Sequence, residues 1–337
     1  MRFLPLLLVL VGGGLGFDKV GQSQAPNKGG QSQAPVTLTV SSTRVLASPG
    51  LGFVGTTQCD EKGDIFFLAG NPQTPVIYEL LRDGSHQVYG LVGDDARDNY
   101  YVAFRADRDG KVSILGGENE SHRPVIFRFG EDPTTSPTKT PLDSPPGMDA
   151  AGLRGFIQLR SGHFLLQGFF DEHAAAKDRG HSYLAEFDSS GTFVRTVTDK
   201  DKLADNAQDW AGHAPLLEGE DGSIYALLPD KVLVLSQTGK VARTIKLVPP
   251  VPDYLAFQAY LAGGRLAIGY YKGAAVLPAK LETLYAVLDA ATGRQLRAYK
   301  PEPQLEGLLP VGFSDEGFVF YKVGEEGRIN LLIARAD

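Results

Sequence analysis

The chain has 337 residues, a single cysteine and a formal net charge of −7. One cysteine excludes an intramolecular disulfide and a metal site built from several cysteines. The acidic balance repels polyanions, so we expect no nucleic-acid partner. We interpret Cys59 as a small hydrophobic residue packed in the interior.

Residues 1–35 are expected to precede the folded domain. Residues 1–11 combine a basic start with a short apolar run, and small glycine-rich residues follow. This pattern is typical of a secretory signal peptide, and it is shorter than the roughly 20 residues that span a bilayer. We place the signal peptide at residues 1–23, with cleavage after Gly16 or Ser23; an uncleaved N-terminal anchor is the alternative. No cysteine lies near this segment, so a lipoprotein is excluded.

Residues 24–35 are interpreted as a flexible linker. The segment Gly21–Pro26 is repeated as Gly30–Pro35, and its Gly, Pro, Gln and Ser residues cannot build a core. The remaining domain, residues 36–337, carries 30 basic and 39 acidic side chains. We therefore expect a secreted or periplasmic monomer with no membrane span after the signal peptide is removed.

A strand–turn–strand pattern recurs six times within residues 36–337. Each copy has a short polar turn containing glycine, followed by a run of apolar and aromatic residues. The turn glycines are 47, 52, 60, 42 and 53 residues apart. These intervals suit propeller blades of about 40–50 residues with loops of variable length. The six glycines are Gly63, Gly110, Gly162, Gly222, Gly264 and Gly317.

A second hairpin follows most copies, so each unit is expected to have four strands, A to D. The sequence therefore predicts an all-β fold, a six-bladed β-propeller of four-stranded antiparallel blades. The last copy ends without a fourth strand, whereas residues 36–40 read as a strand that precedes the first copy. We expect residues 36–46 to complete the last blade and close the ring, because unpaired edges promote aggregation. An open solenoid or a two-sheet sandwich is the alternative.

Strand alternation places the A–B and C–D turns at one end of such a ring, and the B–C and D–A loops at the other. The turns of the first class are nearly all two to five residues long. Long loops gathered on a rigid scaffold are where binding usually occurs, so we predict the ligand site at the B–C and D–A end. The long segments are residues 91–99, 131–149 and 199–212 between blades, and 169–182 and 272–283 within blades.

Two of these loops, in blade three and just before blade four, contain two of the six histidines and the single tryptophan, and a third histidine, His213, directly follows the second loop. Imidazole and carboxylate groups together suit a ligand or metal site. The alternative is a solvated loop in which the tryptophan only packs. The candidate binding residues are Asp171, Glu172, His173, His181, Asp209, Trp210 and His213.

The sequence contains no Gly-x-Ser-x-Gly nucleophile elbow, no His-Glu-x-x-His pair, no phosphate-binding loop and no calcium-loop pattern. No catalytic residue is therefore assigned. The first prediction is an exported module that binds a protein or a small molecule.

The repeated Asp-x-x-Gly turns, as in Asp60–Gly63 and Asp107–Gly110, resemble those of the six-bladed propellers of the NHL, TolB-like and gluconolactonase-like group. The resemblance covers nearly all of residues 36–337 and implies the propeller fold. Gluconolactonase-like enzymes hold a divalent metal on the axis. The resemblance therefore implies an alternative function, a propeller hydrolase or lactonase with an axial divalent ion such as calcium.

Overall fold

The computed structural model describes fourteen stretches of the chain. They are residues 34–46, 54–60, 62–71, 74–107, 110–143, 151–170, 181–197, 216–219, 221–228, 230–237, 240–272, 282–314, 316–324 and 329–335. Nearly all of these stretches are strands or the tight turns between them.

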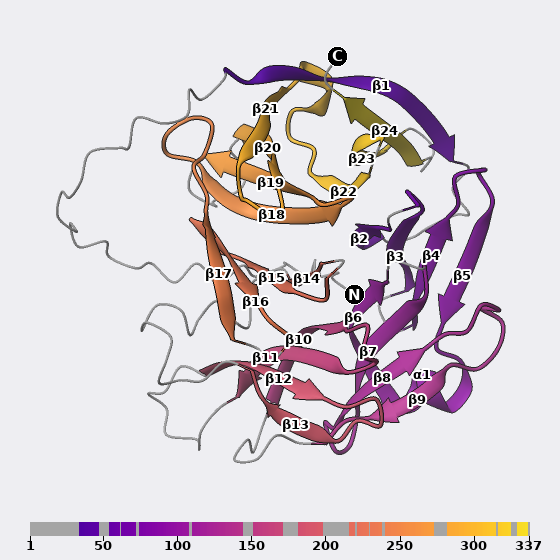
Figure 1. Ribbon diagram of the computed structural model, residues 1–337. Helices are drawn as coiled ribbons and strands as arrows, with labels where there is room; N and C mark the ends of the chain where they lie inside the picture. The colour runs from indigo at the N-terminus through magenta and orange to yellow at the C-terminus, as the bar shows by residue number, and fades with distance from the viewer. Residues whose placement is uncertain are drawn as a thin grey trace, which may run out of the picture.

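The first three blades are four-stranded antiparallel sheets formed by consecutive strands. Each blade has its first strand innermost and its last strand outermost (Figure 1). Blade one contains β2 (Val54–Cys59), β3 (Ile65–Asn71), β4 (Thr74–Leu80) and β5 (His86–Gly90); blade two contains β6 (Asn99–Ala106), β7 (Val112–Glu118), β8 (Pro124–Arg128) and β9 (Thr138–Pro141); blade three contains β10 (Ala151–Gln158), β11 (Phe164–Phe170), β12 (His181–Phe187) and β13 (Phe193–Thr196).

The remaining three blades repeat this arrangement, except that the last one borrows its outer strand from the N-terminal side of the domain. Blade four contains β14 (Leu216–Glu218), β15 (Ile224–Leu227), β16 (Lys231–Leu235) and β17 (Val241–Lys246); blade five contains β18 (Leu255–Ala262), β19 (Arg265–Lys272), β20 (Glu282–Asp289) and β21 (Gln295–Pro301); blade six contains β22 (Pro310–Ser314), β23 (Gly317–Val323), β24 (Ile329–Arg335) and β1 (Val36–Leu46).

Strand β1 closes the ring. Its residues 39–46 pair antiparallel with β24, and residues 36–38 pair parallel with 299–301 of β21 in blade five. Figure 1 shows this strand along the outer edge beside β24 and β21. The prediction that residues 36–46 complete the last blade is confirmed, and the six-bladed, all-β architecture with it.

The six turn glycines all adopt the left-handed backbone conformation, with φ between 68° and 119°. At Gly110, for example, the amide donates to the carbonyl of Asp107 to close the tight A–B turn of blade two. A residue with a Cβ atom would be strained at such a φ, which explains why glycine recurs at this point of every repeat.

One predicted loop is wrong. Residues 131–149 were expected to form a single link between blades, but Thr138–Pro141 is strand β9, the outer strand of blade two. Residues 129–137 are therefore the C–D turn of that blade and lie at the short-turn end of the ring. The prolines in and next to β9 make it hard to predict from the sequence, because proline is unfavourable in most strands and is tolerated in an outer one.

The core consists of six hydrophobic clusters, one between each pair of neighbouring blades. Phe66 and Ile77 of blade one, for example, pack against Val125 and Phe127 of blade two. Another cluster joins blade six to blade one. Both faces of every sheet are thus covered by a neighbour, which is possible only because the ring is closed.

We predict that Leu38→Ala destabilises the domain by about 2–5 kcal/mol. Leu38 lies in β1, is only 1% exposed, and packs in the cluster between blades five and six. Chemical denaturation measures the loss. Thr37→Ala, at an exposed position of the same strand, is the matched control and should change the free energy of unfolding by about 0.5 kcal/mol or less. Equal effects of the two substitutions would contradict the packing of β1.

Candidate functional site

The binding residues predicted from the sequence lie outside the described structure. Asp171, Glu172, His173, Asp209, Trp210 and His213 fall in undescribed segments, and His181 begins β12 but its side chain is not described. The predicted site therefore stays a prediction, and the described residues direct attention to the other end of the ring.

The innermost strands of all six blades end around a small cavity on the axis. These strands are β2, β6, β10, β14, β18 and β22, and each contacts the innermost strand of the next blade. The cavity, hereafter the axial cavity, has a volume of about 120 Å³ and lies where these strands enter the short A–B turns. Its lining residues are Cys59, Asp60, Arg105, Ala106, Asp107, Ile157, Gln158, Leu217, Glu218, Tyr260, Leu261 and Phe313.

A wider hollow of about 820 Å³ lies beside the axial cavity, between blades two and three; we call it the rim groove. Its wall includes the C–D turn of blade two, through Phe129 to Glu131, and the A–B turn glycine Gly162 of blade three. Asp107, Gln158 and Glu218 line both spaces. The rim groove therefore adjoins the axial cavity on the short-turn face.

Asp60 is the most unusual residue of the axial cavity. Its side chain is 5% exposed, and its Oδ1 accepts a hydrogen bond of 2.9 Å from the Asp64 amide. Its Oδ2 has no hydrogen-bond partner among the described residues. Burial raises the pKa of Asp60 to about 6, and the charge of Asp64 adds to this effect, whereas Lys62 and the hydrogen bonds of the turn oppose it.

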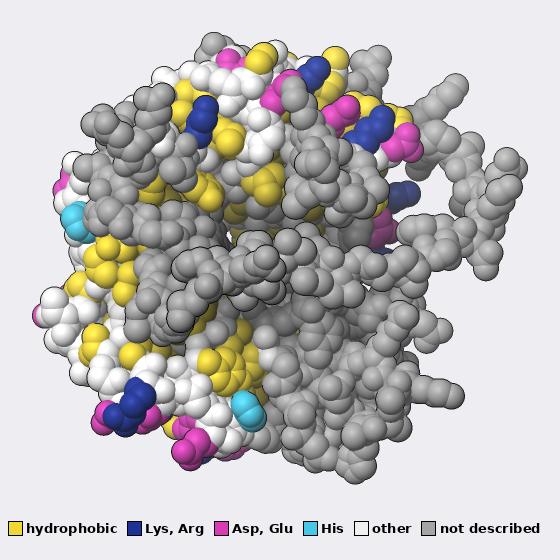
Figure 2. Space-filling model, turned by 180° about the vertical axis from the view of Figure 1, so that it is seen from behind, with side chains coloured by type: hydrophobic (Ala, Val, Ile, Leu, Met, Phe, Trp, Pro, Cys, Tyr) yellow, Lys and Arg dark blue, Asp and Glu magenta, His cyan; other side chains and the backbone are white. Residues whose placement is uncertain are grey.

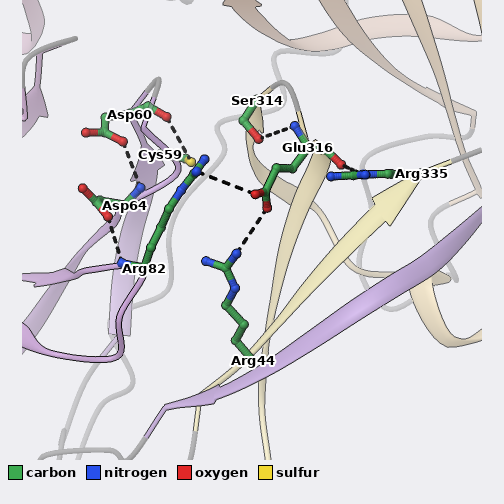
Figure 3. Close-up of polar contacts among 8 residues, drawn as sticks. All are labelled: Arg44, Cys59, Asp60, Asp64, Arg82, Ser314, Glu316 and Arg335. Atoms are coloured by element: carbon green, nitrogen blue, oxygen red, sulfur yellow. Dashed lines mark hydrogen bonds and ion pairs between the residues drawn. The ribbon is translucent and has the colours of Figure 1, made fainter.

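A chain of polar contacts links Asp60 to the ring closure. Asp64 Oδ1 accepts the Arg82 amide at 3.0 Å, and the Arg82 guanidinium pairs with Glu316 at 3.6 Å. Glu316 also pairs with Arg44 of β1 at 3.2 Å. Figure 3 shows Glu316 between the two arginines, with Asp60 beyond Asp64. The side chains of these ion pairs are 31–41% exposed, so each pair contributes at most about 1 kcal/mol.

Arg105 supplies a positive charge to the same cavity from blade two. Burial lowers the pKa of its guanidinium to about 10, and the negative charges of Glu218 and Asp107 oppose that shift. The guanidinium therefore stays charged at neutral pH and lies in the field of two carboxylates. Beside it, Gln58 donates to the Phe104 carbonyl at 2.8 Å and accepts from the Ala106 amide at 3.0 Å, which joins blade one to blade two.

The opposite wall of the axial cavity is apolar and tightly packed. A Cβ atom at Gly312 of β22 would lie 2.0 Å from the Cys59 Cβ, so the inner strands of blades six and one are in close contact. Cys59 packs against the cluster between these blades, as expected for a small hydrophobic residue, although it is only partly buried. Burial and nearby carboxylates raise its thiol pKa, which makes it a poor nucleophile.

Figure 2 views the molecule from behind Figure 1 and shows several separate groups of hydrophobic side chains. Four of the exposed large hydrophobic residues lie on outer strands of different blades: Val88, Val194, Val241 and Leu296. Singly exposed residues of this kind are normal for a soluble surface. The described hydrophobic residues therefore do not indicate a docking surface on the outer rim.

The arrangement of six sheets around an axis decides the architecture. The chain is a β-propeller. No family model and no curated protein matches it. Among solved structures it is similar to a puromycin hydrolase, with a TM-score of 0.51 and 13% identity over 90% of this chain. The chain spans 56% of that protein's length.

Two further solved structures have lower TM-scores. A protein named as the calcium-binding protein regucalcin, from Agrobacterium tumefaciens, has a TM-score of 0.48 and 13% identity over 90% of this chain and 96% of its own. The WD40 domain of Pan2 from Neurospora crassa has a TM-score of 0.49 and 11% identity over 89% and 95%. At such identities the comparisons show the fold and no specific family.

Within the stretches that the structure describes, no group of three or more His, Cys, Asp or Glu side chains is placed to hold a metal ion. The same stretches contain no helix long and apolar enough to cross a membrane.

We predict that Asp60→Asn changes the pH dependence of stability. The folded-state pKa of about 6 lies above the ordinary value of 3.8, so the buried carboxyl favours the folded state at low pH and this contribution is lost as the pH rises through about 4 to 6. Thermal unfolding at several pH values measures this. The melting temperature of the variant minus that of the parent should increase over this window.

Asp83→Asn is the control for that experiment. Hydrogen bonds from Ser85 lower the pKa of the Asp83 carboxyl, so its ionised form favours the folded state and its removal should give no increase with pH. A difference for Asp60→Asn that stays flat from pH 4 to pH 7 would contradict the burial of this carboxylate.

Proposed function

We propose that this chain is an exported β-propeller that binds its ligand on the short-turn face, through the rim groove and the axial cavity. The observation that carries the proposal is that the two spaces adjoin: Asp107, Gln158 and Glu218 line both. A ligand in the groove between blades two and three would thus reach residues from all six blades at the axis. Rigid propeller scaffolds with a lined central opening are suited to such binding.

The residues that line both spaces are polar, and the axial cavity also has apolar walls. Gln158, Asp107 and Glu218 offer hydrogen-bond and charge contacts, whereas Ile157, Leu217 and Phe313 line the axial cavity with apolar surface. A few polar groups converging on an apolar pocket favour orientation of a ligand and its specificity. We name no catalytic residue.

The long-loop end remains a second proposed site, with His173, His181, His213 and Trp210 as its candidate residues. The hydrolase or lactonase alternative needs an axial divalent ion such as calcium. Among the described residues, no three or more His, Cys, Asp or Glu side chains are grouped so that they could hold one, so we name no metal ligands. Export to the periplasm or the exterior, cleavage of residues 1–23 and a monomeric state are part of the same proposal.

Two substitutions distinguish the two faces. Gln158→Trp places a large ring at the junction of the rim groove and the axial cavity, where Gln158 is half-buried. Trp210→Ala removes a candidate residue of the second proposed site, and Trp210 is not among the residues that line the rim groove or the axial cavity. Both variants should keep the strand spectrum and the cooperative melting of the parent. They are compared with the parent in one binding screen of small polar molecules and short peptides, read by thermal shift.

We expect ligands of the parent to lose at least ten-fold in affinity for Gln158→Trp and to bind Trp210→Ala unchanged. The opposite pattern would move the site to the long-loop end and overturn the assignment to the short-turn face. Ligands that bind both variants like the parent would overturn both sites.

A further inference from the structure

The carboxylate of Asp60 has only one of its two oxygens in a hydrogen bond with a described residue. Its Oδ1 is held by the amide of Asp64, but the buried Oδ2 has no hydrogen-bond partner among the described residues. Figure 3 shows that the Asp60 carboxylate lies beyond Asp64 and is separate from the Arg82–Glu316 pair. A buried carboxylate oxygen without a partner is strongly unfavourable, so it marks a place where a ligand group would be stabilised.

The space beside this carboxylate suits one small group. The axial cavity measures about 120 Å³, somewhat less than an engineered cavity of about 150 Å³ that admits benzene. It therefore has room for about five or six non-hydrogen atoms. Tyr260, Leu261 and Phe313 line it with aromatic and aliphatic surface, which suits the methylene stem of a chain with a polar head. The Tyr260 hydroxyl is already used, because it donates to the Pro310 carbonyl.

The charge balance favours a cationic head. Three carboxylates line the axial cavity, namely those of Asp60, Asp107 and Glu218, together with the guanidinium of Arg105. Outside the lining, the charge of Lys62 also acts on Asp60, so the carboxylates still outnumber the cations by one. Arg105 lies in the field of Glu218 and Asp107. An anionic group in this cavity would meet an excess of negative charge, whereas a cation would reduce that excess and give Asp60 a partner.

We propose that the axial cavity binds an alkylammonium or alkylguanidinium group, with the charged head on Asp60 Oδ2 and the stem against Tyr260 and Phe313. This inference rests on the proposed function and names the chemical class of its ligand. The same chemistry occurs in free small amines and in lysine or arginine side chains of a partner protein. Asp60 is the residue that recognises the charge.

The test uses three small molecules of similar shape: n-butylammonium, 1-butanol and butyrate. Each is titrated into the folded chain at neutral pH and constant ionic strength, with binding read by calorimetry and by thermal shift. Saturable binding of n-butylammonium is expected, at least ten-fold tighter than that of the other two. Asp60→Asn should weaken it at least ten-fold and should leave the fold intact, because an asparagine oxygen can still accept the Asp64 amide.

Two other variants keep the test sharp. Asp83→Asn is the matched control, because Asp83 is an exposed carboxylate of the same blade that does not line the axial cavity and does not act on Asp60; its affinity for n-butylammonium should equal that of the parent. Ala106→Leu narrows the cavity without changing its charge and should weaken binding, so the proposal stays testable even if Asp60→Asn does not fold.

The outcomes separate this inference from the proposed function. Equal affinity of the parent and Asp60→Asn, no saturable binding of n-butylammonium, or tighter binding of butyrate would overturn the cationic site. If butyrate or butanol binds and Gln158→Trp abolishes that binding, the result supports a binding site on the short-turn face and overturns only the cationic ligand class. A Gly-Gly-Lys-Gly-Gly amide that binds tighter than n-butylammonium supports a cationic side chain of a partner; weaker binding supports a free amine.

Discussion

The whole domain depends on ring closure by β1, because no blade can bury both of its faces alone. Each of the six hydrophobic clusters lies between two neighbouring sheets, and the cluster between blades six and one exists only when the last blade meets the first. Strand β1 pairs with β24 of blade six and touches β21 of blade five. Closure thereby removes the exposed edge of blade six and holds two blades together.

The repeat architecture could be predicted from the sequence because its signals are local. A glycine with positive φ is required in every A–B turn, and the spacing of Gly63, Gly110 and the other four turn glycines measures the length of each blade directly. The missing fourth strand of the last repeat likewise left one place for residues 36–46. The outer strand β9 was missed, since its four residues, Thr138–Pro141, follow Pro137, end in a proline and show no apolar alternation.

The axial cavity could not be predicted in the same way, because its lining comes from single residues at the ends of six different strands. Asp60 belongs to a repeated turn, and nothing local distinguishes it from Asp107 at the same position of the next repeat. Only the assembled ring shows that Asp60 is buried with one oxygen that has no hydrogen-bond partner among the described residues, whereas Asp107 lies at the junction with the rim groove. The sequence-based prediction placed the site at the B–C and D–A end because the longest loops lie there. Loop length shows where insertions are tolerated and says nothing about cavities at the ends of inner strands.

Asp60 also shows why a residue can be unfavourable for folding and still belong to a site. Burial disfavours its ionised form, and the charge of the Asp64 carboxylate adds to this effect, whereas the hydrogen bond from the Asp64 amide opposes it. An amide of the same shape would keep the hydrogen bond from the Asp64 amide and remove the buried charge. Binding sites commonly retain such destabilising groups, because a ligand of opposite charge binds more tightly to a carboxylate that is poorly stabilised in the free protein. The free energy lost by burying the Asp60 carboxylate is offset by the six hydrophobic clusters between the blades. The closed ring can therefore hold a buried carboxylate beside its axis.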